Sequence, residues 1–284
     1  MTPQDALRAA GQHHGLVLLD GGPCPGGEIG ARYAQGARGE TYVYKCLDQH
    51  SLDWATEMVG RVERLRANGY PASRYLAPLE LDGSVVLLQE KAEGGWSDLV
   101  DDRCLERVLS ISDRQAGLGT PGTGWSDFIA STLTEGADGY CLHDTLFDYG
   151  GEAKTILEWV RAVGHEGTVL PQNDLVHFDF HHRNILQADG ADFTIIDLEG
   201  CQPGDRAFDL VAFSLWLDNA QAPRFAEQAV WEKAANITEP AHLRAYVAHM
   251  VLRRVDWTIR LHPTEVEQSL SVSRRFIDRV EAAS

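Results

Sequence analysis

The segment LVHFDFHHRNILQADGADFTIIDLEG, residues 175–200, sets polar side chains with catalytic potential between apolar runs. Asp179 lies two residues after His177 and five residues before Asn184. Asp197 closes the apolar run that follows. A carboxylate can orient a hydroxyl group and accept its proton, and amide and carboxylate oxygens are the hard ligands that suit Mg²⁺. The spacing H-x-D-x-x-x-x-N, followed by a strand-end aspartate, is typical of loops that transfer phosphoryl groups.

Two other interpretations of this segment stay open. In one, His177 and Asp197 are hydrogen-bonded partners in ordinary core, although burying a carboxylate is costly unless it is paired. In the other, His177, His181 and His182 bind a transition metal, although adjacent histidines tend to diverge and no distant cluster supplies further ligands. The phosphoryl-transfer hypothesis accounts for the spacing as well as for the residue types.

The local pattern predicts that the oxygen-bearing residues meet. Residues 174–187 and 192–199 have the composition of two short strands, and the Asp-Gly pair in the intervening ADGAD is a strong hairpin signal. Asn184 and Asp197 would then be neighbours, with Asp179 in the loop before the hairpin. We expect all three to converge on one mouth.

The rest of the chain must position this loop, and its two halves differ in pattern. Before about residue 92, short β-type runs alternate with glycine-rich turns, and a single helical pattern over residues 51–69 has Ser51 as its cap and Gly69 as its stop. The β-type runs cover residues 15–20, 30–35, 40–47 and 84–90.

Helical patterns dominate after the connector KAEGGWSD. They cover residues 105–118, 153–164, 207–217, 226–235 and 241–261. The sequence therefore predicts an α+β protein with two lobes. The first, residues 1–92, holds a mainly antiparallel sheet and the second, residues 93–284, is mainly helical, with a hinge near residues 89–95.

Charge and composition exclude several classes of protein. The net charge is −17, which disfavours nucleic acid as a partner, and residues 93–170 alone carry 14 acids and 5 bases. No apolar run reaches the length of about 20 residues that a membrane helix needs, and the N-terminus lacks the pattern of a signal peptide. Five scattered cysteines without a C-x-x-C pair indicate reduced thiols. We expect a cytoplasmic protein that binds neither membrane nor nucleic acid.

Together, HFDFHHRN, IIDLE and GDRAFDL resemble the signature of the aminoglycoside phosphotransferase and choline kinase family, a branch of the protein-kinase-like fold. The similarity runs from about residue 15 to the end of the chain. Across its whole length the chain most resembles the kinases that modify the cyclic-peptide antibiotics capreomycin and viomycin. The resemblance implies a two-lobed kinase-like fold and transfer of phosphate from ATP, or GTP, with Mg²⁺ to a hydroxyl of a cationic antibiotic.

Three alternatives stay open within and beyond this resemblance. The acceptor could be an aminoglycoside or a metabolite such as choline, homoserine or a sugar. The chain could also be a nucleotide-binding module without catalytic activity. The sequence DLE at 197–199 stands where protein kinases have D-F-G, which makes a protein substrate less favoured.

The resemblance also implies roles for individual residues. Asp179 would be the catalytic carboxylate, Asn184 and Asp197 would hold Mg²⁺, and His177 and Asp209 would support the loop.

In the first half, Lys45 at the end of an apolar strand would contact the nucleotide phosphates and pair with Glu57 on the following helix, with Glu63 as the competing acid. The glycine-rich stretch GGPCPGGEIGARYA would cover the phosphates, and the connector would meet the adenine. The remaining candidate contacts with the nucleotide are Gly26, Gly27, Gly30, Glu90 and Ala92.

Overall fold

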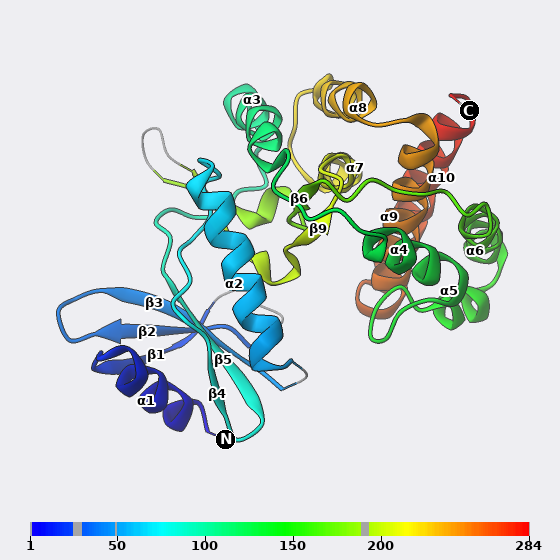
Figure 1. The fold of residues 1–284 in the computed structure, drawn as a ribbon. Helices are drawn as coiled ribbons and strands as arrows, with labels where there is room; N and C mark the ends of the chain where they lie inside the picture. The colour runs from blue at the N-terminus through cyan, green and yellow to red at the C-terminus, as the bar shows by residue number, and fades with distance from the viewer. Residues whose placement is uncertain (1, 25–29, 49, 189–192, 284) are drawn as a thin grey trace. The chain divides into compact units, whose positions relative to one another are not determined.

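The computed structural model describes most of the chain, in four stretches: residues 2–24, 30–48, 50–188 and 193–283 (Figure 1). The chain divides into two compact units, and each is described by itself. The first unit consists of residues 1–96 and 184–201, and the second of residues 97–183 and 202–284. The sequence assigned residues 184–201 to the second lobe, whereas the structure groups them with the first.

A five-stranded antiparallel sheet forms the first unit (Figure 1). The strands follow the order β1-β2-β3-β5-β4. Their bounds are β1 Leu18–Pro23, β2 Arg32–Gly36, β3 Thr41–Leu47, β4 Leu79–Leu81 and β5 Ser84–Glu90. Pairing of β3 with β5 puts two largely buried strands at the centre, and Tyr44 and Leu88 contribute to the core there.

Two helices accompany this sheet. Helix α1 (Pro3–His14) packs across it and buries Leu7, and helix α2 (Leu52–Ala67) packs against β5. Helix α2 begins as expected, because the Ser51 hydroxyl accepts a hydrogen bond from the Trp54 N–H at 3.2 Å. It ends just before Gly69, whose positive φ of 83° stops the helix.

The predicted hairpin is present and belongs to the first unit. Strands β7 (Ile185–Gln187) and β8 (Phe193–Ile195) pair antiparallel. The N–H of Ile195 donates to the Pro71 carbonyl at 2.7 Å, which ties the hairpin to this unit. The Asp-Gly turn at 189–190 lies outside the described residues.

The predicted strand over residues 174–187 is not continuous. Strand β6 (Asp174–Val176) pairs with β9 (Gln202–Gly204) in the second unit, and only Ile185–Gln187 pairs in the hairpin. Side-chain and backbone hydrogen bonds in the intervening loop replace strand pairing, so the polar residues sit on an irregular backbone and not on a β-ladder.

Helices make up most of the second unit (Figure 1). They are α3 Asp102–Ile111, α4 Gly124–Glu135, α5 His143–Tyr149, α6 Gly151–Gly164, α7 Ala207–Trp216, α8 Ala226–Ile237, α9 Pro240–Leu261 and α10 Val266–Glu281. Helix α9 packs against α4, α5, α6, α7 and α10, and nearly every residue of α7 is buried. None of the described helices is both long and apolar enough to span a bilayer.

Candidate active site

The loop that carries Asp179 belongs to the second unit, and we call residues 177–183 the catalytic loop. A buried carboxylate on α7, Asp209, accepts the backbone N–H of His177 at 2.7 Å and that of Phe178 at 2.9 Å. The amide of Gln115 also donates to Asp209, at 2.5 Å. Burial raises the pKa of Asp209, and these donors oppose that shift. Asp209 therefore shapes the loop, the role the sequence proposed for it.

Asp179 is held from two directions within this unit. Its N–H donates to Nδ1 of His177 at 3.2 Å, and its carboxylate accepts a hydrogen bond from Nη2 of Arg253 on α9 at 2.7 Å. Phe178 lies between His177 and Asp179 in the sequence. Its backbone has φ of 75°, a left-handed conformation that is strained for a residue with a Cβ. Such a backbone persists only where surrounding contacts fix it, as Asp209 and Arg253 do here.

The three histidines of the loop point in different directions. Nε2 of His181 lies 3.8 Å from Oδ2 of Asp179, whereas Nε2 of His182 lies 3.4 Å from Oδ1 of Asp98. The rings of His181 and His182 are 6.2 Å apart at 70°, and His177 is fully buried. Among the described residues no group of three or more histidine, cysteine or acidic side chains is arranged to hold a metal, so these histidines do not form the alternative transition-metal site.

Lys45 is the buried cation of the first unit. Its ammonium pairs with Asp197 and with Glu199, the latter at 2.9 Å, and the Tyr75 hydroxyl donates to Glu199 at 3.4 Å. Burial disfavours the charged ammonium and acts to lower its pKa. The two carboxylates outweigh this effect and raise the pKa of Lys45. Burial likewise raises the pKa of Glu199, while Lys45 acts to lower it. We call these four residues the lysine cluster.

The predicted ion pair between Lys45 and Glu57 is wrong. Glu57 is 68% exposed and binds Arg61, one helical turn later, at 2.6 Å. Arg61 also donates to the carbonyl of Cys201 at 3.3 Å. Glu63, the competing candidate, pairs with Arg66. Both glutamates of α2 bind arginines of their own helix, and the 3₁₀ turn Leu198–Gly200 supplies Glu199 to Lys45 instead.

Glu199 is not among the site residues predicted from sequence, although the sequence carries a signal for it. An acid two residues after a strand-end aspartate, in the otherwise apolar stretch IIDLEG, needs a cationic partner if it is buried. Lys45 is one of only four lysines in the chain.

Asn184 and Asp197 flank the paired strands of the hairpin. Ile185 pairs with Ile195, and the N–H of Ile196 donates to the carbonyl of Asn184 at 3.0 Å. Asn184 is buried, and Asp197 has a left-handed backbone with φ of 67°. The hairpin therefore places an amide and a carboxylate on adjoining strand ends. This donor set of hard oxygens fits Mg²⁺.

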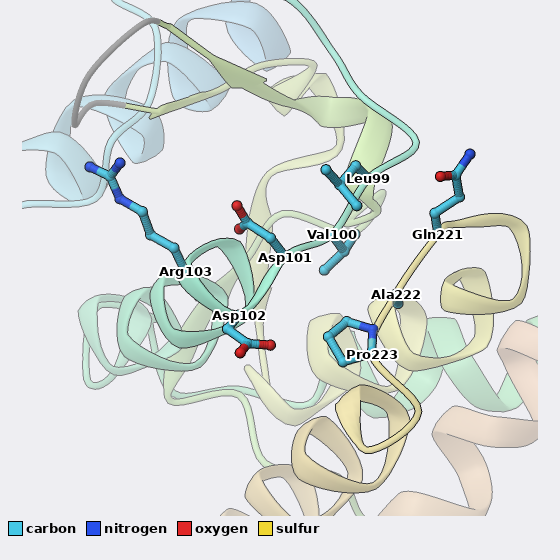
Figure 2. Close-up of a pocket in the computed structure, with 8 residues that line it drawn as sticks. All are labelled: Leu99, Val100, Asp101, Asp102, Arg103, Gln221, Ala222 and Pro223. Atoms are coloured by element: carbon cyan, nitrogen blue, oxygen red, sulfur yellow. The ribbon is translucent and has the colours of Figure 1, made fainter.

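A groove of about 700 Å³ lies in the second unit (Figure 2). Figure 2 shows Asp101, Asp102 and Arg103 at the start of α3 on one rim and Gln221 to Pro223 on the other. Asp98, beside the groove, binds Nε of Arg183 in the catalytic loop at 3.1 Å. Asp101 accepts the Cys104 N–H at 2.7 Å and so caps α3. Asp98 and Asp101 thus already have partners within the second unit.

Comparison with known families decides the class of the protein. Residues 21–246 match the phosphotransferase enzyme family. The chain belongs to this family. It is therefore an enzyme of the small-molecule kinase class. A comparison with curated proteins finds no match.

Solved structures similar to this phosphotransferase share its fold at low sequence identity. A thermostable mutant of aminoglycoside phosphotransferase APH(4)-Ia, in ternary complex with AMP-PNP and hygromycin B, is 16% identical with a TM-score of 0.66, covering 98% of this chain and 99% of that one. A protein from Haemophilus somnus 129PT described as a "putative fructosamine-3-kinase" is 12% identical with a TM-score of 0.63, covering 96% of each chain. The AMP-bound spectinomycin phosphotransferase APH(9)-Ia is 11% identical with a TM-score of 0.62, covering 98% and 96%. The fold is thus the α+β, two-lobed protein-kinase-like fold.

The remaining predicted nucleotide contacts of the phosphotransferase are only partly described. Gly26 and Gly27 lie outside the described residues, and Gly30 is exposed with φ of 63°, which favours glycine. The N–H of Glu90 donates to the Arg74 carbonyl at 2.8 Å. The N–H of the next residue, Lys91, also donates to a carbonyl within the first unit. A role for Gly30, Glu90 and Ala92 in nucleotide binding stays a prediction.

Proposed function

We propose that this phosphotransferase transfers the terminal phosphoryl group of ATP to a hydroxyl of a cationic antibiotic of the capreomycin or viomycin type and thereby confers resistance. The proposal rests on one observation above all: the carboxylate of Asp179 is fixed on a strained loop by Asp209 and Arg253. Similar structures crystallised with AMP-PNP and AMP support ATP, and their antibiotic substrates support this class of acceptor.

On the nucleotide side, the proposal assigns roles to the first unit. Lys45 would leave part of its pairing with Asp197 and Glu199 and contact the nucleotide phosphates. Asn184 and Asp197 would hold Mg²⁺, which neutralises phosphate charge when bound. The buried position of Lys45 fixes its ammonium, so little entropy is lost when it binds phosphate.

On the acceptor side, Asp179 would receive the hydroxyl. The hydroxyl oxygen forms a bond to the terminal phosphorus, the bond from that phosphorus to the ADP oxygen breaks, and the hydroxyl proton passes to Asp179. An aspartate is a weak base, so orientation of the hydroxyl is its larger contribution. A transition state with little bond formation to the acceptor needs orientation more than it needs a strong base.

The acidic stretch 93–170 supports a cationic acceptor, but only some of its acids are available. At least four of its 14 acids pair with basic residues: Asp98 with Arg183, Asp113 with Lys233, Glu152 with Arg274 and Glu166 with Arg244. Glu135 and Asp138 are exposed at the end of α4 and in the following loop. Tyr140 of that loop packs against Phe178 of the catalytic loop, with ring centroids 6.3 Å apart. These two acids are therefore our preferred contacts for the cation.

The direct test is a phosphate-transfer assay with a panel of hydroxyl compounds: capreomycin, viomycin, an aminoglycoside, choline, homoserine and a neutral sugar. We expect turnover with a cyclic-peptide antibiotic. Turnover confined to the aminoglycoside, or to choline, homoserine or the sugar, would instead assign the enzyme to that class. We place the enzyme in the cytoplasm, which supplies ATP, and a fractionation of producing cells checks this.

Two variants test the roles of the aspartates. Asp179→Asn should remove most turnover with little change in the affinity for ATP, because its proposed partner is the acceptor. Asp197→Asn should weaken binding of Mg²⁺ and ATP, measured by equilibrium titration. Near-normal turnover in the Asp179 variant with every accepted substrate would contradict the assignment.

A further inference from the structure

We propose that Arg253 is a positioning residue for phosphoryl transfer, acting through Asp179. The inference rests on the proposed function, because it takes Asp179 as the residue that receives the acceptor hydroxyl. Arg253 lies on α9, 74 residues after Asp179, and no sequence motif connects the two.

Arg253 makes three contacts with two consecutive residues of the catalytic loop. Nη2 donates to the Asp179 carboxylate at 2.7 Å, and Nη1 donates to the Phe178 carbonyl at 2.9 Å. The guanidinium carbon also lies 5.3 Å from the centre of the Phe178 ring. A planar guanidinium can make both hydrogen bonds at once with fixed geometry, which a lysine ammonium on a flexible stem cannot reproduce.

These contacts complete the support of a strained turn. Asp209 accepts the N–H of Phe178, and Arg253 donates to the carbonyl of the same residue. An anion and a cation therefore hold the two peptide groups that flank Phe178, whose φ is 75°. The backbone direction at Asp179 follows from this arrangement, so loss of Arg253 would release both the backbone and the carboxylate.

Arg253 extends from a well-packed helix. Its side chain is 21% exposed, and it extends from a 22-residue helix. One turn earlier on α9, His249 is fully buried and its ring lies 5.6 Å from that of Phe178. Helix α9 thus contacts the turn twice, through the ring of His249 and through the guanidinium of Arg253.

Arg253 also places a positive charge beside the carboxylate of Asp179. A neighbouring guanidinium favours the ionised form of a carboxylate, so its removal should be visible in the pH dependence of turnover. Other titratable or charged groups around the turn are His177 and His181 in the loop, Asp209 on α7, His249 on α9, and Tyr140 and Cys141 before α5.

The experiment compares Arg253→Gln and Arg253→Lys with Arg244→Gln, a matched control on the same helix whose guanidinium, 16% exposed, binds Glu166 and Glu281. Kinetics are measured with the acceptor of the panel that the wild-type enzyme turns over best. The test of Arg253 therefore does not depend on whether that acceptor is an antibiotic. Arg253→Gln should lower kcat by about 30-fold or more and leave the KM for ATP within about threefold. The acid limb of its kcat/KM profile should move up by about one pH unit.

Arg253→Lys keeps the charge and loses the second hydrogen bond. We expect its acid limb to stay at the wild-type pH while kcat falls by about tenfold. This variant decides the matter if Arg253→Gln does not fold, as judged by thermal unfolding. A kcat within about threefold of wild type in either folded variant, or an unmoved acid limb in Arg253→Gln, would overturn the proposal, as would an equal loss in Arg244→Gln.

Discussion

Replacing Glu199 by Gln tests the lysine cluster most sharply. The change keeps the size of the side chain and its capacity to accept a hydrogen bond, and it removes one of the two negative charges on Lys45. Glu57→Gln is the matched control, because Glu57 was the partner expected from sequence and instead binds Arg61 on an exposed helix face.

The structure sets the size of the expected effect. A hydrogen bond to a charged group contributes about 1.5–3 kcal/mol, and leaving a buried charge without a partner costs about 3–5 kcal/mol. Lys45 retains Asp197, so the smaller figure applies and we expect a loss of about 2 kcal/mol. That is about a thirtyfold change in an equilibrium constant. The exposed pair of Glu57 and Arg61 should contribute less than about 0.5 kcal/mol.

Two assays read this out. Urea unfolding gives the stability, and steady-state kinetics give kcat/KM for ATP, which should fall by about 10- to 30-fold in Glu199→Gln and less than about threefold in Glu57→Gln. In a double-mutant cycle with Lys45→Met, Glu199→Gln should be non-additive by about 1–2 kcal/mol, whereas Glu57→Gln should be additive. The reasoning fails if Glu57 couples to Lys45 and Glu199 does not.

Three further predictions concern the second unit. Asp209→Asn should lower the free energy of unfolding by about 3 kcal/mol in urea, because His177 and Phe178 lose a charged acceptor; an unchanged midpoint would count against this. Burial lowers the pKa of His249 to about 3. As the pH falls, this histidine is therefore protonated in the unfolded chain before it is protonated in the folded one, and the free energy of unfolding should fall by about 2–3 kcal/mol between pH 7.5 and pH 4.5. His249→Leu should lose that much of the pH dependence of unfolding, and an identical slope would refute the assignment. For a cationic acceptor kcat/KM should fall steeply as salt rises, while a neutral one should show little response; equal responses would exclude steering by the acidic stretch.

The parts of the site that sequence predicted are those set by local spacing. Asp179 and Asn184 lie five residues apart in one loop, and a short hairpin brings Asn184 and Asp197 to adjoining strand ends. In the sheet of the first unit, β1, β2 and β3 pair in chain order, and helix α2 is bounded by Ser51 and Gly69. Such features depend on side-chain type and chain geometry over a few residues.

The misses come from partners that are far apart in sequence. Lys45 and Asp197 are 152 residues apart, and no local pattern says whether α2 turns Glu57 toward the lysine or toward Arg61. The pairing of Arg253 with Asp179 is of the same kind.

Some strands and helices were also not predicted, because their residues have a low intrinsic propensity for the structure that they form. Strand β9 has the sequence QPG and exists by pairing with β6, while α4 begins at Gly124 without a side-chain cap. Tertiary contacts, and not propensity, decide these elements.

The discontinuity of the first unit has a consequence for biosynthesis. Its last stretch, residues 184–201, supplies both carboxylates that bind Lys45, so a nascent chain that has emerged only to residue 96 contains a sheet with a lysine at a core position and neither of its anions. At about 5–20 residues per second, the ribosome adds the 152 residues from Lys45 to Asp197 in about 8–30 s. During this interval the amino-terminal sheet must either stay incompletely folded or keep its lysine in water. The enzyme therefore completes its first unit only after residues 97–183 of the second have been translated, and a fragment that ends before Asp197 should not form a stable sheet.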